Sequence, residues 1–266
     1  MTMIQGSLVV VRGAGDLATG CILRLVRAGF RVVALEVPEP SAIRRTVSFS
    51  ECVYDGTATV EGVRAQRCDR VPATWASGDP VTVLVDPGCA CLSALAPVAR
   101  VDAIIAKRNL GTRMDMAPVV VALGPGFEAG RDAHAVVETN RGHDLGRVLL
   151  RGSAEANTGV PGLIGGHGGE RVIHAPLSGT VQPLCAIGDR VRAGDPVLTI
   201  AGVPVPAAID GVVRGLIRPG YQARAGLKVA DVDPRGEREH CFSASDKARA
   251  IAGGVLEAVL MLGAPR

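Results

Sequence analysis

The stretch Leu8-Val-Val-Val-Arg-Gly-Ala-Gly-Asp-Leu-Ala-Thr-Gly20 decides the fold class of this chain. A β-branched apolar run stands directly before a glycine turn. A helical pattern over 21–29 and a second apolar run over 30–37 follow. Strand, glycine turn, helix and strand in this order predict a βαβ unit.

The turn has the spacing of a dinucleotide-binding fingerprint. Gly13 permits a tight turn, Gly15 lets a pyrophosphate approach the backbone, and Ala18 lets the helix pack on the strand. Glu36 ends the second strand, where an acid accepts a ribose hydroxyl. This spacing predicts nucleotide binding. The alternative is that the glycines serve packing alone, with Asp16 as an ordinary helix N-cap that repels anions.

The composition indicates a globular chain and limits its partners. Of 266 residues, 47% are apolar and 3% aromatic, and the net charge of +3 is dispersed, which argues against a nucleic-acid platform. No apolar run reaches the ~20 residues of a membrane span. Arg12 interrupts the first apolar run, unlike a signal peptide, and seven cysteines fit a reduced compartment. We therefore expect a cytoplasmic protein without a membrane partner.

The sequence divides into three regions that differ in their pattern of predicted strands, helices and turns. Strands predicted at 80–87 and 101–106 flank a predicted helix near 90–99, and this alternation indicates a parallel, doubly wound sheet. The predicted fold class is α/β, with a Rossmann-like domain over 1–170. Residues 171–232, with Gly-Asp and Asp-Gly turns, resemble a biotinyl/lipoyl-like β-sandwich whose tip at 202–206 lacks the acceptor lysine. Residues 233–266 form a helix that docks on the α/β domain.

Polar residues follow several predicted strands, where ligands of such sheets bind. Lys107, Arg108 and Asn109 suit an anion by charge-assisted hydrogen bonds, although such residues are often merely solvated. Two later loops complete the predicted cofactor-binding set, with His143 as either a general acid–base or a structural histidine. These loops contribute Gly124, Gly126, Glu138, Asn140, Arg141 and His143.

Metal ligands at familiar spacings are absent from the sequence. Cys89 and Cys91 lack a second Cys/His pair at zinc-finger spacing, and His134 with Glu138 falls on a predicted strand rather than a helix. We predict no metal site. The cysteine pair is either redox-active or, by default, two buried thiols.

Seven segments together resemble the YqeB family, accessory proteins associated with selenium-dependent molybdenum hydroxylases. They are RGAGDLATG (12–20), AIRRTVSFSE (42–51), AKRNLGT (106–112), GPGFEAGRD (124–132), ETNRGHDLGR (138–147), DVDPR (231–235) and SDKA (245–248). The resemblance implies a maturation role toward a molybdenum hydroxylase apoenzyme, through its molybdopterin cofactor or its labile selenium or sulfur ligand. It assigns no catalytic residue.

Three functions follow from these observations. The first is a maturation factor that binds an anionic nucleotide or molybdopterin-type cofactor. The second is an NAD-dependent oxidoreductase, favoured by Glu36. The third is a non-catalytic, protein-binding scaffold. The sequence leaves open the ligand, catalysis, selenium versus sulfur dependence, and whether the chain forms a homo-oligomer.

Overall fold

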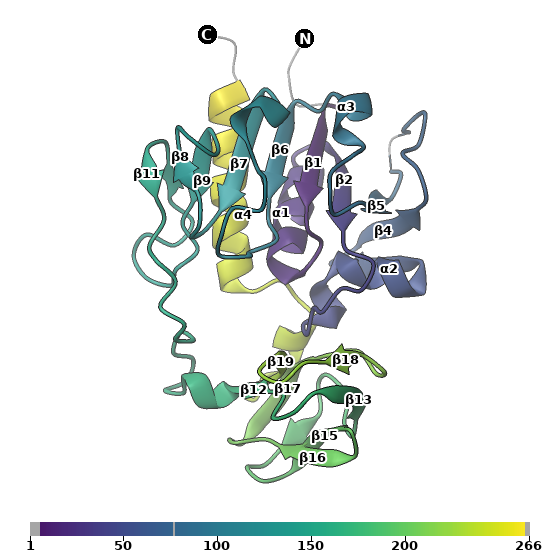
Figure 1. The fold of residues 1–266 in the computed structure, drawn as a ribbon, viewed down its shortest axis with the longest axis vertical. Helices are drawn as coiled ribbons and strands as arrows, with labels where there is room; N and C mark the ends of the chain where they lie inside the picture. The colour runs from purple at the N-terminus through teal and green to yellow at the C-terminus, as the bar shows by residue number, and fades with distance from the viewer. Residues whose placement is uncertain (1–5, 77, 264–266) are drawn as a thin grey trace. The chain divides into compact units, whose positions relative to one another are not determined.

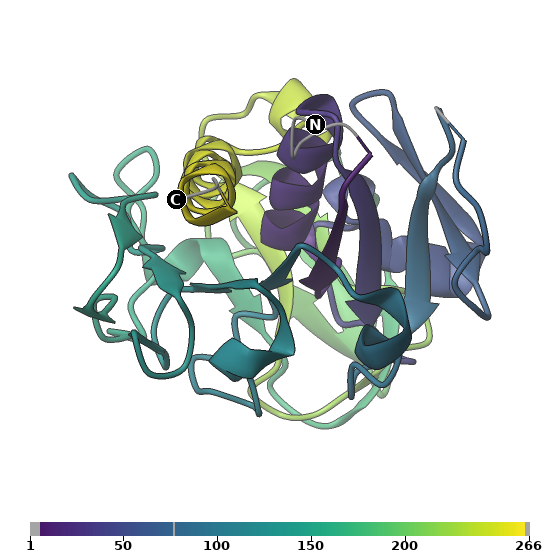
Figure 2. The ribbon, with the colours of Figure 1, turned by 90° about the horizontal axis from the view of Figure 1, so that it is seen from above.

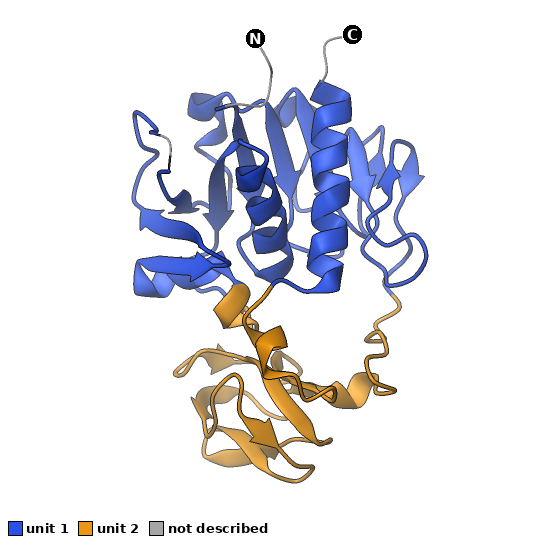
Figure 3. Cartoon of the chain, turned by 180° about the vertical axis from the view of Figure 1, so that it is seen from behind, with its two compact units in different colours: residues 1–40, 48–157, 244–266 blue, residues 41–47, 158–243 orange. Residues whose placement is uncertain are grey.

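The computed structural model describes residues 6–76 and 78–263, which fall into two compact units (Figure 3). Unit 1 takes the ranges 1–40, 48–157 and 244–266, and unit 2 takes 41–47 and 158–243. The sequence places boundaries after 170 and 232. In the structure, the chain passes from unit 1 to unit 2 between residues 157 and 158 and returns to unit 1 between residues 243 and 244. The short segment 41–47 also belongs to unit 2.

Unit 1 is built on a nine-stranded sheet in the order β10-β9-β7-β6-β1-β2-β5-β4-β3 (Figure 1). Its strands are β1 (Leu8–Arg12), β2 (Arg31–Glu36), β3 (Thr57–Val60), β4 (Val63–Cys68), β5 (Val81–Val85), β6 (Ala99–Asp102), β7 (Val119–Leu123), β9 (Ala135–Val137) and β10 (Val148–Leu149). A separate pair joins β8 (Glu128–Ala129) and β11 (Gly152–Ser153). The helices are α1 (Asp16–Arg27), α2 (Cys52–Asp55), α3 (Leu92–Leu95) and α4 (Asp246–Gly263).

The βαβ unit predicted from the opening stretch is present. β1 pairs in parallel with β2, with Val10 opposite Val33, and α1 connects them. Val9, Val10 and Val11 are all fully buried, as expected for a parallel strand covered on both faces.

The helices α1 and α4 lie side by side on one face of the sheet (Figure 2). A Cβ atom at Gly20 of α1 would lie only 2.9 Å from the Cβ of Ala248 in α4. Likewise, a Cβ at Gly254 would lie 2.1 Å from the carbonyl oxygen of Gly146. Glycines therefore let the last helix of the chain press against the first helix and the loop before β10.

The main sheet corrects part of the predicted fold class, because it is mixed rather than parallel. β3 and β10 pair antiparallel to their neighbours at the two edges. The two-residue turn Glu61–Gly62 has φ of +46° and +81°. Such a turn can join only adjacent antiparallel strands.

The expected doubly wound pattern also fails at residues 90–99. The helix there is only α3, because Ala96 is left-handed at φ +42° and Pro97 follows it. The predicted strand at 101–106 is β6, which begins and ends earlier.

Unit 2 consists of two four-stranded sheets in the orders β12-β19-β17-β14 and β16-β15-β13-β18. All of their pairings are antiparallel. Their strands are β12 (Val172–His174), β13 (Gly179–Pro183), β14 (Arg190–Val191), β15 (Pro196–Ile200), β16 (Val203–Pro206), β17 (Gly211–Leu216), β18 (Gln222–Ala223) and β19 (Lys228–Asp233).

The expectation of a self-contained biotinyl/lipoyl-like sandwich over 171–232 is wrong. Unit 2 takes in the distant segment 41–47, where the Leu216 N–H donates to the Ile43 carbonyl at 2.7 Å. The Arg45 Nε–H donates in turn to the Leu216 carbonyl at 2.7 Å. Spacing within 171–232 cannot reveal strand partners that come from outside it.

Across residues 6–76 and 78–263, no helix combines the length and apolar character needed to cross a bilayer.

Candidate functional site

The candidate site lies at the carboxyl edge of the unit 1 sheet. Seven neighbouring strands from β9 to β4 run in parallel, so their carboxyl ends share one edge. Most of the predicted cofactor-binding residues lie in the loops that leave this edge. Glu36 ends β2, Asp16 is the first residue of α1, and Ala18 is buried within α1.

The two glycines of the opening turn have different roles. Gly13 has φ +103°, a conformation that strains any other residue, and a Cβ there would lie 3.1 Å from the Ala103 carbonyl oxygen, so the turn itself favours glycine. Gly15 has an ordinary φ of −66°, and no heavy atom lies within 4 Å of where its Cβ would be. Packing does not require glycine at 15, and the backbone there is open to a ligand. Gly15 is itself the N-cap, so Asp16 is the first residue of the helix rather than its cap.

Glu36 braces this turn. Its Oε2 accepts the Ala14 N–H at 2.8 Å, and its Oε1 accepts the Val37 N–H at 2.8 Å. Burial raises the pKa of Glu36, and these two backbone hydrogen bonds oppose the rise. The carboxylate predicted to accept a ribose hydroxyl is thus already engaged by the protein backbone.

Arg12 ties together the carboxyl ends of β1, β5 and β6. Its guanidinium donates to the carbonyls of Pro87 and Leu110, each at 3.0 Å, and lies 3.2 Å from Asp102. Asp102 is completely buried and also contacts Arg100 at 3.6 Å. Arg12 is therefore a structural clamp rather than a ready anion ligand.

The loop after β6 presents two cations. Lys107 and Arg108 are exposed, and their side chains have no hydrogen bond or ion pair within the described parts of the chain. Lys107 has φ +61°, an unfavourable conformation for a residue with a side chain. Asn109 instead braces the turn, accepting the Thr112 N–H at 2.7 Å and donating to its carbonyl at 2.9 Å.

Two glycines join neighbouring loops at this edge. A Cβ at Gly126 would lie 2.4 Å from the Arg108 backbone nitrogen. A Cβ at Gly124 would lie 2.3 Å from Oγ1 of Thr139. The predicted segments around 107, 124 and 138 therefore meet, as the sequence predicts for strand ends of one sheet.

The loop after β9 is mostly structural. Glu138 is buried and accepts the N–H groups of Thr139, Asn140 and Glu155, each at 2.7 Å. The Asn140 amide donates to the side chain of Glu155. Arg141 forms a two-pronged ion pair with Asp246 at 2.7 and 3.0 Å.

His143, in the same loop, is exposed and has no side-chain partner among residues 6–76 and 78–263. No contact among the described residues therefore supports either of its predicted roles, general acid–base or structural histidine.

Lys247 is a residue at this edge that sequence reasoning missed. It lies in the first turn of α4, is half-buried, and has no hydrogen bond or ion pair within the described chain. Burial, followed by the charge of Arg141, lowers its pKa, against the opposing charges of Asp16, Glu138 and Asp246. The motif SDKA at 245–248 marked this position, but nothing in its spacing indicated a site.

All seven cysteines are free thiols. Burial and the neighbouring Asp86 raise the pKa of Cys91 to about 12, so it remains a thiol at neutral pH. The Sγ of Cys89 lies 3.7 Å from a guanidinium nitrogen of Arg100. Within the described residues, no three His, Cys, Asp or Glu side chains gather as a metal site.

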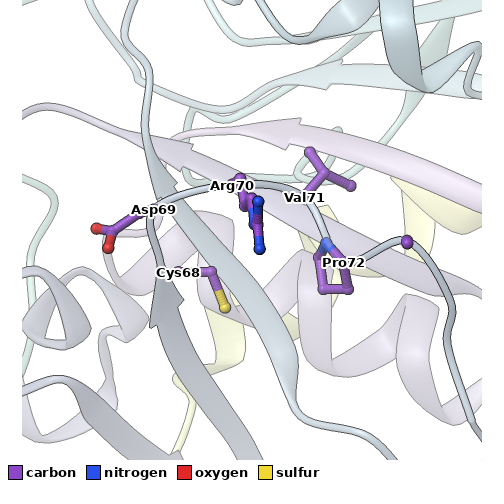
Figure 4. Close-up of a pocket in the computed structure, with 6 residues that line it drawn as sticks. Cys68, Asp69, Arg70, Val71 and Pro72 are labelled. Carbon is purple, nitrogen blue, oxygen red and sulfur yellow. The ribbon is translucent and has the colours of Figure 1, made fainter.

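A cavity of about 620 Å³ lies elsewhere, along the loop 68–73 that follows β4 (Figure 4). None of the predicted site residues lines it. Its walls come from one continuous loop, which brings no separate elements together.

No protein-family model matches the sequence. The chain is 52% identical over 261 residues to the uncharacterized protein YqeB of Escherichia coli (strain K12), and the match covers 96% of the chain. This similarity over the matched region supports membership of the YqeB family. The chain spans only 48% of the length of that YqeB, so the activity of the longer protein is not carried over with the family.

Three solved structures overlap the chain weakly, each covering 86% of it and 85% of the other chain. One is a succinylglutamate desuccinylase/aspartoacylase from Rhodobacter sphaeroides (17% identity, TM-score 0.29). The others are the ectoine utilization protein EutE (DoeB) from Ruegeria pomeroyi (13%, 0.26) and an aspartoacylase family protein from Mesorhizobium loti (14%, 0.29). Overlaps this small do not define a shared fold.

Proposed function

We propose that the carboxyl edge of unit 1 binds an anionic, phosphate-bearing cofactor of the nucleotide or molybdopterin type. Through that cofactor the chain serves the maturation of a molybdenum hydroxylase, its partner being the apoenzyme. The hydroxylase role, with its selenium dependence, rests on the family resemblance. The binding role rests on the geometry of the edge.

The unpartnered cations Lys107 and Arg108 carry the proposal. Most arginines at this edge already hold the protein together, as Arg12 and Arg141 do. Lys107 and Arg108 do not, and Gly126 fixes their backbone from the next loop. Charge-assisted hydrogen bonds from such a pair suit a phosphate. The open backbone at Gly15 offers a second approach to the same edge.

The NAD-dependent oxidoreductase is less well supported. Both oxygens of Glu36 accept backbone N–H groups, so the acid that favoured NAD has a structural task. A scaffold function predicts that the edge binds no cofactor, and the same experiment tests it.

The experiment compares Lys107→Ala/Arg108→Ala with a control, Arg192→Ala/Arg224→Ala, which removes two exposed cations from unit 2. Retention of molybdopterin cofactor and of NAD is measured by native mass spectrometry and titration calorimetry. We expect the wild type and the control to retain the molybdopterin species and the edge variant to lose it.

Selective retention of NAD would instead favour the oxidoreductase. Failure of the wild type to retain either molecule would overturn the binding proposal and leave the scaffold. Retention by the edge variant at wild-type affinity would remove Lys107 and Arg108 from the site.

A further inference from the structure

Lysine is rare in this chain and concentrated at one place. Only three of the 29 Lys and Arg residues are lysines, namely Lys107, Lys228 and Lys247. Two of them, Lys107 and Lys247, lie at the carboxyl edge of unit 1, and Lys228 lies in β19 of unit 2. Guanidinium stays protonated in proteins, whereas a lysine amine can lose its proton when it is buried. The edge therefore holds two of the three lysine amines in a chain whose other basic side chains are mostly arginines.

The packing of two helices positions Lys247. The close approach of Gly20 to Ala248 places the residue beside the first turns of both α1 and α4. Both helices begin at this side of unit 1, and each N-terminal turn adds a partial positive charge. An anion between the two turns would gain from both helices and from the amine.

The charged groups around Lys247 come from two helices and one loop. Asp16 belongs to α1, Glu138 and Arg141 lie in the loop after β9, and Asp246 precedes Lys247 in α4. Glu138 is occupied by three N–H groups, and Asp246 receives both prongs of Arg141. None of the three carboxylates forms an ion pair with Lys247, which is left as a half-buried ammonium without a contact partner.

We propose that Lys247 is the amine that contacts the anionic phosphate group of the ligand, between the first turns of α1 and α4. This inference rests on the proposed function and names a contact that it does not specify. An ammonium that is partly withdrawn from water without a direct ion pair is unfavourable, and a phosphate ester or diphosphate supplies a counter-charge in contact with it. Binding therefore increases the affinity of Lys247 for its proton, so that at alkaline pH, where the free amine is partly deprotonated, the complex takes up protons as it forms.

The first test labels amines with a water-soluble acylating reagent from neutral to alkaline pH, with and without saturating inorganic pyrophosphate. Peptide mass spectrometry resolves the three lysines separately. We expect Lys247 to react with a lower pH midpoint than Lys228 and to be protected by pyrophosphate. Lys228 serves as the internal control and should be unchanged.

The second test measures pyrophosphate affinity and, at alkaline pH, proton uptake by calorimetry in buffers of different ionisation enthalpy. Lys247→Met should weaken binding by about tenfold or more, the size expected for one hydrogen bond between charged groups. Lys247→Arg should keep part of the affinity but abolish the proton uptake, because guanidinium does not titrate. A residue with only a structural role would not separate these two readouts.

The outcomes distinguish this inference from the proposed function. If calorimetry shows that pyrophosphate binds while Lys247 stays unprotected and Lys247→Met binds normally, the Lys247 contact is wrong and the anion site stands. If the wild type binds neither pyrophosphate nor molybdopterin cofactor, both proposals fail.

Discussion

Arg12 and Asp102 face each other at the last paired position of the parallel strands β1 and β6, with their side chains 3.2 Å apart. The carboxylate of Asp102 is fully buried and also accepts the hydroxyl of Thr112. Because Arg12 reaches the loops at Pro87 and Leu110 as well, this ion pair fixes the strand ends from which the candidate site is built.

Asp102→Asn should destabilise the protein by about 3–5 kcal/mol, the cost of removing one partner from a buried ion pair. Arg12 and the fully buried Arg100 would lose their shared counter-ion. Urea unfolding measures the change. Asp115→Asn, which breaks an exposed pair with Arg113, should cost less than about 1 kcal/mol. Equal losses in the two variants would contradict a clamping role for Asp102.

Gly126→Ala should destabilise unit 1 and disturb the loop 107–108. The new Cβ would lie 2.4 Å from the Arg108 nitrogen, and the φ of +99° is itself unfavourable for alanine. Gly111→Ala is the matched control, because its φ is +90° but no heavy atom lies within 4 Å. Strain alone costs about 1–3 kcal/mol, so the loss at 126 should clearly exceed that at 111 in urea unfolding.

Glu36→Gln should lower stability by about 1–3 kcal/mol even without any ligand. Glutamine presents one oxygen where two backbone N–H groups need acceptors, so one donor is left facing an NH₂ group. Thermal and urea unfolding measure the loss, with the exposed Glu39→Gln as the control. Unchanged stability would return Glu36 to the role of a cofactor ligand.

Asp233 should make unit 2 sensitive to acid. Burial raises the pKa of this carboxyl, but hydrogen bonds from Arg235 and the charge of Arg214 outweigh burial and lower it overall. Because the folded pKa lies below the unfolded one, the stabilisation is present above about pH 4 and is lost as the pH falls through the folded value.

Urea unfolding across acidic pH would show this dependence in the wild type and a flatter one in Asp233→Asn. The exposed Glu237→Gln should retain the wild-type slope. A wild-type slope in Asp233→Asn would locate the acid sensitivity elsewhere.

Lys247→Met should stabilise the protein at neutral pH. Burial makes the folded pKa of Lys247 lower than its ordinary 10.5, so the folded state is penalised wherever the lysine is charged. The penalty is full below the folded pKa and fades as the pH rises toward the unfolded value. The stability difference between variant and wild type should therefore shrink at alkaline pH, as thermal unfolding would show. A destabilised variant at neutral pH would indicate a structural amine.

Local pattern was a good guide to local structure. The apolar run, turn and helix of 8–36 correspond to β1, α1 and β2, because each element is encoded within its own residues. Arrangements between distant residues were not readable in the same way. Nothing near Ser41 indicates that 43–45 pairs with β17, and nothing near Lys247 shows that α4 brings it beside Asp16.

Some errors had a signal that could have prevented them. Glu61–Gly62 stands between two short alternating runs, which favours a hairpin and therefore an antiparallel edge. The small number of lysines could have singled out Lys247 from the sequence alone. By contrast, the engagement of Glu36 by backbone N–H groups depends on coordinates, since the same acid at the same spacing also suits a ribose.

The position of α4 sets an order on folding during synthesis. Unit 1 begins with β1, yet the helix that covers α1 and the loop before β10 is made after the whole of unit 2. On the ribosome, the antiparallel sheets of unit 2 can close once β19 has emerged, while the earlier sheet waits with one face uncovered. The sheet that is made first is therefore covered only after unit 2 has been made, and its candidate site, which includes the first turn of α4, cannot bind its ligand before α4 has been synthesised.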